Sequence, residues 1–238
     1  MRHHLKIGYV PLNFDLVSAP GDYRRFPEYA KIRGIKFELA KENEKYDLVI
    51  VSQGADITVW SKYPYGVVVY DFVDSYLSIP YTNIKGLLRG LIKFLTRKHN
   101  KLELNYWKSV QKMCERSDAV VCSTNSQRED ILPFCNNTKV ILDIQDSVVG
   151  DVKEMYETKD VFKIVWEGLP CNLYQVKLIS KVLRQLSQKY NIELHIITDP
   201  FIPSALGNFF RISTKLEVEK IFHNTVFHEW NKETLSEI

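Results

Sequence analysis

The chain has 238 residues, of which 45% are hydrophobic and 26% are charged, and its formal net charge is +3. This composition is typical of a globular protein with one large domain or two modest ones. The longest stretch without a charged residue has eleven residues (200–210), which excludes a spanning helix because such a helix needs about 20 apolar residues. The small charge excess gives no reason to expect nucleic acid as a partner.

The four cysteines are scattered, without a C-x-x-C pair or a nearby histidine pair. This spacing predicts neither a metal site nor a redox dithiol. It is typical of buried thiols in a reducing compartment, so we expect a cytoplasmic protein.

Short runs of β-branched and aromatic residues alternate with helix-like stretches in the first part of the chain. Such alternation predicts an α/β fold with a parallel sheet wrapped by helices. Gly34 is expected to end the first helix, and Asn125 or Ser126 to cap the helix that starts at Gln127. The expected strands are 5–11, 36–39, 47–52, 66–72, 119–123 and 139–144, and the expected helices are 24–33, 87–116 and 127–134.

An acidic stretch poor in apolar periodicity, 143–160, predicts a crossover between two domains, 1–150 and 151–238. A second α/β pattern follows, with a strand at 162–166, an amphipathic helix at 173–190 and a strand at 192–198. Two shorter strands are expected at 209–213 and 224–229, and Asn231 is expected to cap a helix. A doubly wound sheet usually has five or six strands, so the second domain is predicted to be a partial Rossmann-like domain.

Ligands of open α/β sheets bind beyond the carboxyl ends of the strands, so the residues after each strand are candidate site residues. Gly21, Arg24 and Arg25 follow the first strand, where a glycine and two arginines at a helix start could bind an anion. A capped helix with exposed basic residues is the alternative. Asp71 and Asp74 follow the fourth strand beside aromatic residues, which suits sugar binding or proton transfer. A turn in which these aspartates cap backbone amides is the alternative.

Several segments together resemble the GT-B glycosyltransferases, in particular glycosyltransferase family 4, the glycosyl transferases group 1 superfamily. They are Gly-Asp-Tyr-Arg-Arg-Phe at 21–26, Ser-Asp-Ala-Val-Val-Cys-Ser-Thr at 117–124, Lys-Ile-Val-Trp-Glu-Gly at 163–168 and Leu-His-Ile-Ile-Thr-Asp at 194–199. The family commonly has a strand similar to the segment at 117–124. The resemblance covers almost the whole chain.

The resemblance implies two Rossmann-like domains that face a cleft, with the acceptor on the N-terminal domain and a nucleotide-sugar donor on the C-terminal one. Transfer in this family is typically metal-independent, so no cofactor is expected and the nucleotide-sugar is a substrate. Glu167 and Gly168 would lie near the donor diphosphate, although a plain strand-to-helix turn is the alternative. The family's E-x₇-E-like donor segment has no counterpart here, so the resemblance predicts a truncated chain that does not catalyse the transfer unaided.

A basic amphipathic pattern occupies residues 84–116. Lys85, Arg89, Lys93 and Arg97 recur every four residues, and leucines lie largely on the other side. A cationic side beside an apolar one is typical of a helix on anionic lipid, so we expect peripheral contact with the inner membrane face. The alternative is that the apolar side is core and the basic side is solvated.

The sequence therefore predicts a glycosyltransferase of polysaccharide or cell-surface biosynthesis that uses a saccharide or lipid-linked acceptor. Asp71 and Asp74 would be catalytic, Gly21, Arg24 and Arg25 would bind acceptor or phosphate, and Glu167 and Gly168 would bind the donor. A nucleotide-sugar epimerase of the same architecture and a non-catalytic binding module are the alternatives.

Overall fold

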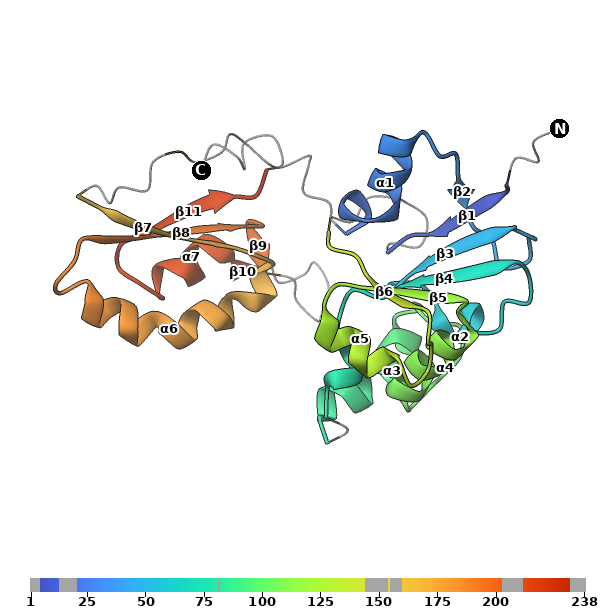
Figure 1. The fold of residues 1–238 in the computed structure, drawn as a ribbon. Helices are drawn as coiled ribbons and strands as arrows, with labels where there is room; N and C mark the ends of the chain where they lie inside the picture. The colour runs from blue at the N-terminus through green and yellow to red at the C-terminus, as the bar shows by residue number, and fades with distance from the viewer. Residues whose placement is uncertain are drawn as a thin grey trace. The chain divides into compact units, whose positions relative to one another are not determined.

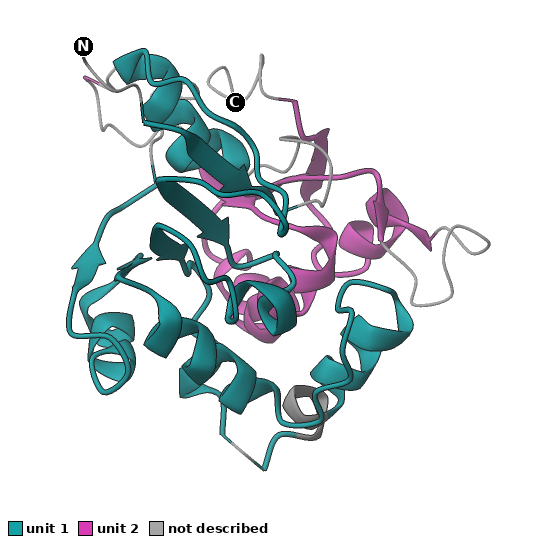
Figure 2. Ribbon diagram, turned by 90° about the vertical axis from the view of Figure 1, so that its right-hand side faces the viewer, with its two compact units in different colours: residues 1–145 teal, residues 146–238 magenta. Residues whose placement is uncertain are grey.

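The computed structural model of the chain describes residues 5–12, 21–80, 82–143, 154, 160–202 and 212–231. These residues belong to two compact units, 1–145 and 146–238 (Figure 2). The expected boundary between residues 150 and 151, and most of the expected crossover, lie outside the described residues.

Unit 1 is built on a six-stranded parallel sheet, and this confirms the α/β prediction. Its strand order is β2-β1-β3-β4-β5-β6, which is a doubly wound order in which successive strands are added on opposite sides of the switch point between β1 and β3. Crevices at such switch points are where ligands of these sheets bind. The strands are β1 Ile7–Val10, β2 Glu38–Leu39, β3 Leu48–Ser52, β4 Val67–Asp71, β5 Ala119–Cys122 and β6 Thr138–Val140.

The helices of unit 1 are divided unequally between the two faces of this sheet. Helix α1 lies alone on one face and the remaining helices lie on the other (Figure 1). The elements are η1 Asp22–Arg24, α1 Phe26–Arg33, α2 Ile57–Trp60, η2 Tyr76–Ser78, α3 Ile84–Leu95, α4 Tyr106–Arg116 and α5 Asn125–Ile131.

The main core of unit 1 lies between the sheet and α2, α4 and α5. Alternate strand residues point into it, because successive side chains of a strand face opposite sides. They include Val49, Val51, Val68, Tyr70 and Val120, each of which is nearly or fully buried. The opposite face of the sheet, on the side of α1, is only partly covered, and this difference creates the pocket described below.

The single helix expected at 87–116 is two helices, α3 and α4, joined by the connector 96–105. Arg97 adopts the left-handed conformation (φ 57°) just after α3. The Asn105 side chain then caps α4 by accepting a hydrogen bond from the Lys108 amide at 3.0 Å. A left-handed residue followed by a new cap ends one helix and starts another.

Two of the expected helix ends can be compared with the structure. Gly34 ends α1 in the left-handed conformation (φ 63°), which confirms the predicted C-cap. Helix α5 starts at Asn125 rather than at Gln127, because the Thr124 hydroxyl accepts a hydrogen bond from the Gln127 amide at 3.1 Å. The predicted cap at Asn125 or Ser126 was therefore wrong by one or two residues.

Unit 2 has a three-stranded parallel sheet in the order β11-β8-β7, which corresponds to half of a doubly wound sheet. Helices α6 and α7 lie on one face of this sheet (Figure 1). The elements are β7 Phe162–Glu167, η3 Pro170–Asn172, α6 Leu173–Leu186, β8 Ile192–Thr198, β9 Phe201–Ile202, β10 Ile212–Ser213, α7 Thr214–Glu219 and β11 Thr225–Glu229.

Strands β9 and β10 of unit 2 form a separate antiparallel pair. Part of the expected strand 209–213 and the helix expected after Asn231 lie outside the described residues. In the described part of the chain, no helix is long and apolar enough to cross a bilayer.

Candidate functional site

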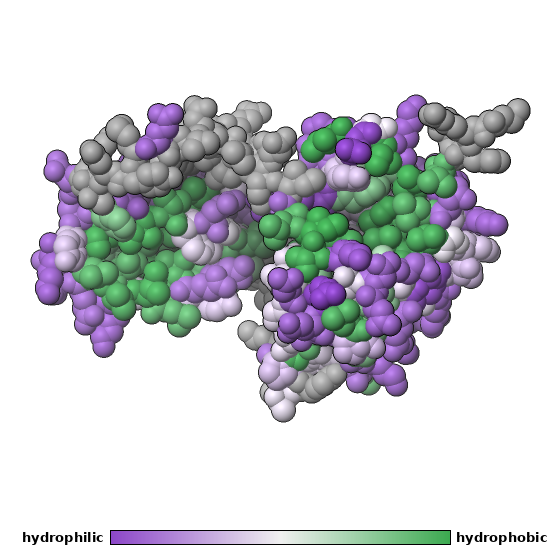
Figure 3. All heavy atoms as spheres, in the orientation of Figure 1, coloured by the Kyte–Doolittle hydropathy of each residue, from purple (hydrophilic) through white to green (hydrophobic). Residues whose placement is uncertain are grey.

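A pocket of about 420 Å³ lies in unit 1, on the face of the sheet that α1 covers only in part. Figure 3 shows hydrophobic residues at the surface of this unit between α1 and the helical layer. Side chains of β3, β4 and β5 form the floor of the pocket, and charged residues stand at one end. The lining residues are Arg24, Arg25, Phe26, Tyr29, Leu48, Ile50, Val69, Asp71, Val121, Ile141 and Leu142.

Two residues that the sequence placed in different roles form one buried ion pair in this pocket. The Arg25 guanidinium donates to the Asp71 carboxylate through Nε at 3.0 Å and Nη2 at 2.5 Å. The side chains are only 4% and 8% exposed. Such bidentate, desolvated pairs have a fixed geometry. The two candidate sites after β1 and β4 are therefore joined.

The same guanidinium extends the network to the end of β6. Its Nη1 donates to the Ile141 carbonyl at 2.6 Å and to the Asp143 carboxylate at 3.1 Å. Burial raises the pKa of the Asp71 carboxyl above its usual range, and the hydrogen bonds and charge of Arg25 oppose that rise. Sequence reasoning assigned Asp143 to a solvated crossover and did not connect it with Arg25.

A second buried polar pair lies next to this network. The Tyr9 hydroxyl donates to the Asp22 carboxylate at 2.5 Å, and Asp22 also accepts from the Leu12 amide at 3.2 Å. Asp22 has no exposed surface, and burial together with this carboxylate raises the pKa of Tyr9. Sequence reasoning missed both residues, although Asp22 lies inside the segment that carried the family resemblance.

Asp74, the other predicted catalytic carboxylate, lies at the solvent-exposed end of β4 in a different setting. Its Oδ2 accepts from Gln53 Nε2 at 3.0 Å and from the Tyr76 hydroxyl at 2.9 Å. Gln53 in turn accepts from the amides of Val73 and Asp74 at 3.1 and 2.6 Å. Gln53 therefore ties the ends of β3 and β4 together and orients Asp74. Gln53 directly follows the expected strand 47–52, and this position is the sequence signal that could have identified it.

Gly21 and Gly54 both lie against Leu12, at the switch point between β1 and β3. A Cβ on Gly54 would approach the Leu12 carbonyl oxygen to 2.5 Å, and one on Gly21 would approach the end of the Leu12 side chain to 2.4 Å. Because backbone cannot yield as a side chain can, glycine is required at Gly54 more strictly than at Gly21. The structure thus gives Gly21 a packing contact, and Arg24 lines the pocket beside Arg25.

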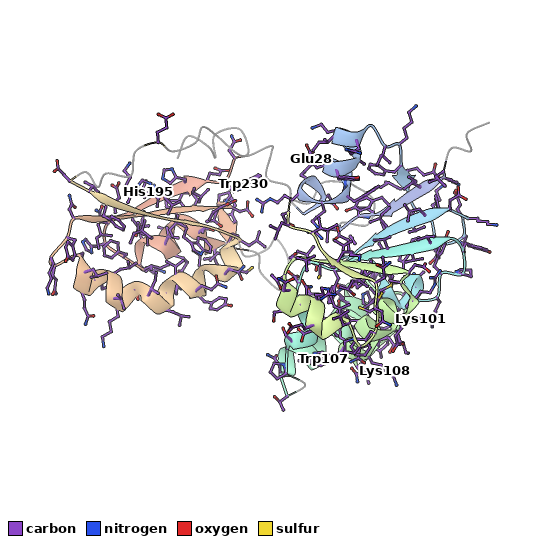
Figure 4. The ribbon with its side chains drawn as sticks, viewed as in Figure 1. Glu28, Lys101, Trp107, Lys108, His195 and Trp230 are labelled. Carbon is purple, nitrogen blue, oxygen red and sulfur yellow. The ribbon has the colours of Figure 1, made fainter. Side chains whose placement is uncertain are left out.

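The predicted donor residues lie at the carboxyl end of β7 in unit 2. The Glu167 carboxylate accepts a hydrogen bond from Trp230 Nε1 at 2.9 Å, so the ends of β7 and β11 are linked; Figure 4 labels Trp230. The Gly168 carbonyl accepts from the Thr198 hydroxyl at 2.6 Å. A Cβ on Gly168 would approach the Trp166 ring to 2.7 Å. The turn before α6 is therefore held by β8, β11 and an indole ring.

Two residues of the predicted membrane stripe turn toward the protein rather than outward. Arg89 stacks on the Tyr76 ring with 4.2 Å to its centroid, and Lys93 Nζ donates to the Tyr106 hydroxyl at 2.9 Å. Burial, and then the charge of Arg89, lower the pKa of Lys93 to about 8. Arg97 is exposed, and the side chain of Lys85 lies outside the described residues.

Within the described ranges, no group of three or more histidine, cysteine, aspartate or glutamate residues could hold a metal ion. Figure 4 labels His195, which lies on the face of the unit 2 sheet opposite α6. His195 hydrogen-bonds to His228 at 2.8 Å and to Glu193 at 2.9 Å. The four cysteines are free thiols, three of them buried in unit 1 and Cys171 exposed in unit 2.

These features define the protein as an α/β protein with two parallel-sheet units and candidate ligand sites at strand ends. No protein-family model and no curated protein sequence matches the chain. Among solved structures, the chain is similar to TarM, with 9% sequence identity and a TM-score of 0.45. The matched region covers 77% of this chain and 32% of TarM, so the chain spans about a third of that protein. At this level of similarity TarM assigns neither fold family nor activity to the chain.

Proposed function

We propose that this protein is a glycosyltransferase that moves a sugar from a nucleotide-sugar to a saccharide or lipid-linked acceptor in polysaccharide or cell-surface assembly. The observation that carries the proposal is the pair of polar assemblies at the end of β4: the Arg25–Asp71 pair in an apolar pocket, and the oriented, exposed carboxylate of Asp74. An apolar pocket with a few convergent polar groups is the usual form of a small-molecule site.

The chemistry assigns different roles to the two aspartates. A transferred sugar needs a group that accepts the proton of the attacking acceptor hydroxyl, and an oriented, solvent-accessible carboxylate can do this. Asp74 meets both conditions, since it is exposed and its Oδ2 is held by Gln53 and Tyr76. Asp71 is buried against Arg25, so its role is to fix that guanidinium at the pocket end rather than to accept the proton.

The donor would bind to unit 2, at the turn between β7 and α6. The backbone amides at the start of a helix favour phosphate, and this turn precedes a helix of 14 residues. Glycine at position 168 lets the backbone come close to a ligand, and the Trp166 ring occupies the space where a Cβ would lie. Protein groups of this kind can stabilise a leaving diphosphate without a metal ion.

The test combines calorimetry with UDP- and GDP-sugars and a turnover assay for nucleotide release. Asp74→Asn should lower turnover by about 10²–10⁴-fold and leave donor affinity unchanged, because it removes only the proton acceptor. Glu115→Gln, an exposed carboxylate on α4, is the matched control and should change neither. Donor binding with full turnover in Asp74→Asn would remove Asp74 from the mechanism.

A non-catalytic binding module is the second candidate, favoured by the internal neutralisation of Arg25 by Asp71 and Asp143. A guanidinium already held by two carboxylates is poorly available to a phosphate. This alternative predicts saccharide binding without nucleotide binding. If the protein binds neither nucleotide-sugar at millimolar concentration but still binds saccharide, the binding module is the correct function and the transferase proposal is wrong.

A further inference from the structure

Helix α3 lies on unit 1 with its charged side inward. Arg89 covers the Tyr76 ring at 4.2 Å and reaches the Tyr106 ring at 5.8 Å, and Lys93 contacts the same Tyr106 through its hydroxyl. Gly90 also faces inward, because a Cβ there would lie 1.8 Å from the Glu103 carbonyl oxygen. Glycine is thus needed for the close approach of α3 to the connector 96–105.

The opposite side of α3 is apolar and faces solvent. Leu88, Ile92 and Leu95, spaced by four and three residues, form one stripe and are 45%, 53% and 69% exposed. We call these three residues the outer face of α3. A surface helix normally buries its apolar stripe, so this orientation is the reverse of the expected one. It also differs from both interpretations of the sequence, which placed the basic side outward.

The connector places further apolar residues beside this helix. Its backbone packs against Gly90, and it carries Leu102 and Leu104, which are 46% and 65% exposed. Exposed apolar side chains gathered on one helix and its connector in this way are typical of an interaction surface.

The connector and α4 also carry exposed positive charge. Arg97, Lys98 and Lys101 on the connector are all exposed, and so are Lys108 and Lys112 on α4. Figure 4 shows Lys101 and Lys108 on the helical layer of unit 1. Lys101 and then Lys112 lower the pKa of the nearby Lys62, so these ammonium groups lie close enough to repel one another.

We propose that the outer face of α3 inserts into the interfacial layer of an anionic lipid bilayer, with the connector lysines at the headgroups. Helix α3 has 12 residues, too few to cross a bilayer but enough to lie in its plane. Anionic headgroups neutralise the cationic rim, whereas a symmetric second copy would bring two such rims together. The charge pattern therefore favours lipid over self-association. This inference does not depend on the transfer reaction.

The experiment is co-sedimentation of the full chain with vesicles of phosphatidylcholine and phosphatidylglycerol in equal parts. Ile92→Glu combined with Leu95→Glu should weaken binding roughly tenfold or more, because both side chains would have to bury a charge. Leu178→Glu is the matched control, a 77% exposed leucine on α6 of unit 2, and it should bind as the wild type does. Protection of the three buried cysteines of unit 1 from thiol reagents checks that unit 1 is folded in the Ile92/Leu95 variant.

A second variant tests the charged rim. Lys98→Glu with Lys101→Glu should reduce binding to the anionic vesicles, and binding of the wild type should fall as salt rises. Equal vesicle binding by the wild type and the Ile92/Leu95 variant would overturn the proposal. A loss of binding in the Leu178 control as large as that in the Ile92/Leu95 variant would also overturn it. A wild-type dimer in ultracentrifugation that the Ile92/Leu95 variant abolishes, without vesicle binding, would assign the face to a second copy instead.

Discussion

Removal of one partner of the Arg25–Asp71 pair should destabilise unit 1 more than any change to an exposed ion pair. Arg25→Met leaves the buried Asp71 carboxylate without a cation, whereas Asp71→Asn leaves the buried guanidinium with the partly exposed Asp143 carboxylate as its remaining partner. The side chains of Arg25 and Asp71 are only 4% and 8% exposed. An uncompensated buried charge costs about 3–5 kcal/mol. Because little solvent reaches either group, that cost needs no reduction for screening.

The double variant separates pairing from simple loss of contacts. Arg25→Met with Asp71→Asn removes both charges, so its free energy of unfolding should exceed the value expected from adding the two single losses by about 2 kcal/mol or more. Lys41→Met, which breaks an exposed pair with Glu44 (75% and 36% exposed), is the control and should leave the free energy of unfolding nearly unchanged.

The cysteines provide an assay that reports on unit 1 alone. Cys114, Cys122 and Cys135 are buried in unit 1, whereas Cys171 is exposed in unit 2 and should react without denaturant. Pulsed thiol labelling across a urea titration, counted by mass spectrometry, therefore gives the unfolding midpoint of unit 1. With a urea slope of about 2 kcal/mol/M, Arg25→Met should lower that midpoint by about 2 M. Asp71→Asn should lower it by less, because Asp143 still pairs with the guanidinium.

The stability of Arg25→Met should depend on pH in a direction that the buried carboxyl of Asp71 determines. Burial raises the pKa of Asp71, and in Arg25→Met the opposing cation is absent, so the folded-state pKa rises further above the unfolded value. A carboxyl with a raised folded-state pKa contributes stability that is present below the unfolded pKa and is lost as pH rises through the folded pKa. The loss in Arg25→Met should therefore grow with pH and be absent from the double variant. Additive losses, or single losses below about 0.5 kcal/mol, would refute this account.

Three further predictions concern other contacts. Gly66→Ala should cost more than Gly34→Ala in the thiol-labelling assay, because both have positive φ but only Gly66 would drive a Cβ to 2.1 Å from a backbone oxygen; equal costs would contradict the steric argument. Lys93, whose pKa burial lowers to about 8, binds fewer protons in the folded state, so wild-type stability should rise from near pH 8 toward the unfolded pKa. Lys93→Met should lack that rise in urea midpoints measured across this range. Trp230→Phe removes the indole donor to Glu167 and should weaken nucleotide-sugar binding in calorimetry by about 2–10-fold, and unchanged affinity would place the donor elsewhere.

The sequence by itself determined the alternation of strands and helices in the fold. Near-continuous runs of β-branched residues have apolar side chains on both faces of a strand, which is typical of the strands of parallel sheets. The six strands of unit 1 and their parallel arrangement could therefore be predicted. Gly34 was predictable for a similar local reason, because only glycine ends a helix in the left-handed conformation without strain. The sequence also indicated which strand ends to inspect, and Arg25, Asp71 and Asp74 all came from that rule.

Only the tertiary structure decided how those residues combine. Arg25 and Asp71 are 46 positions apart, and nothing local to either one shows that it is the partner of the other. Amphipathic periodicity showed that α3 has two sides but not which side turns outward, since that depends on Tyr76 and Tyr106 from other elements. Periodicity is a property of one helix, whereas pairing and orientation are set by what the rest of the chain brings against it.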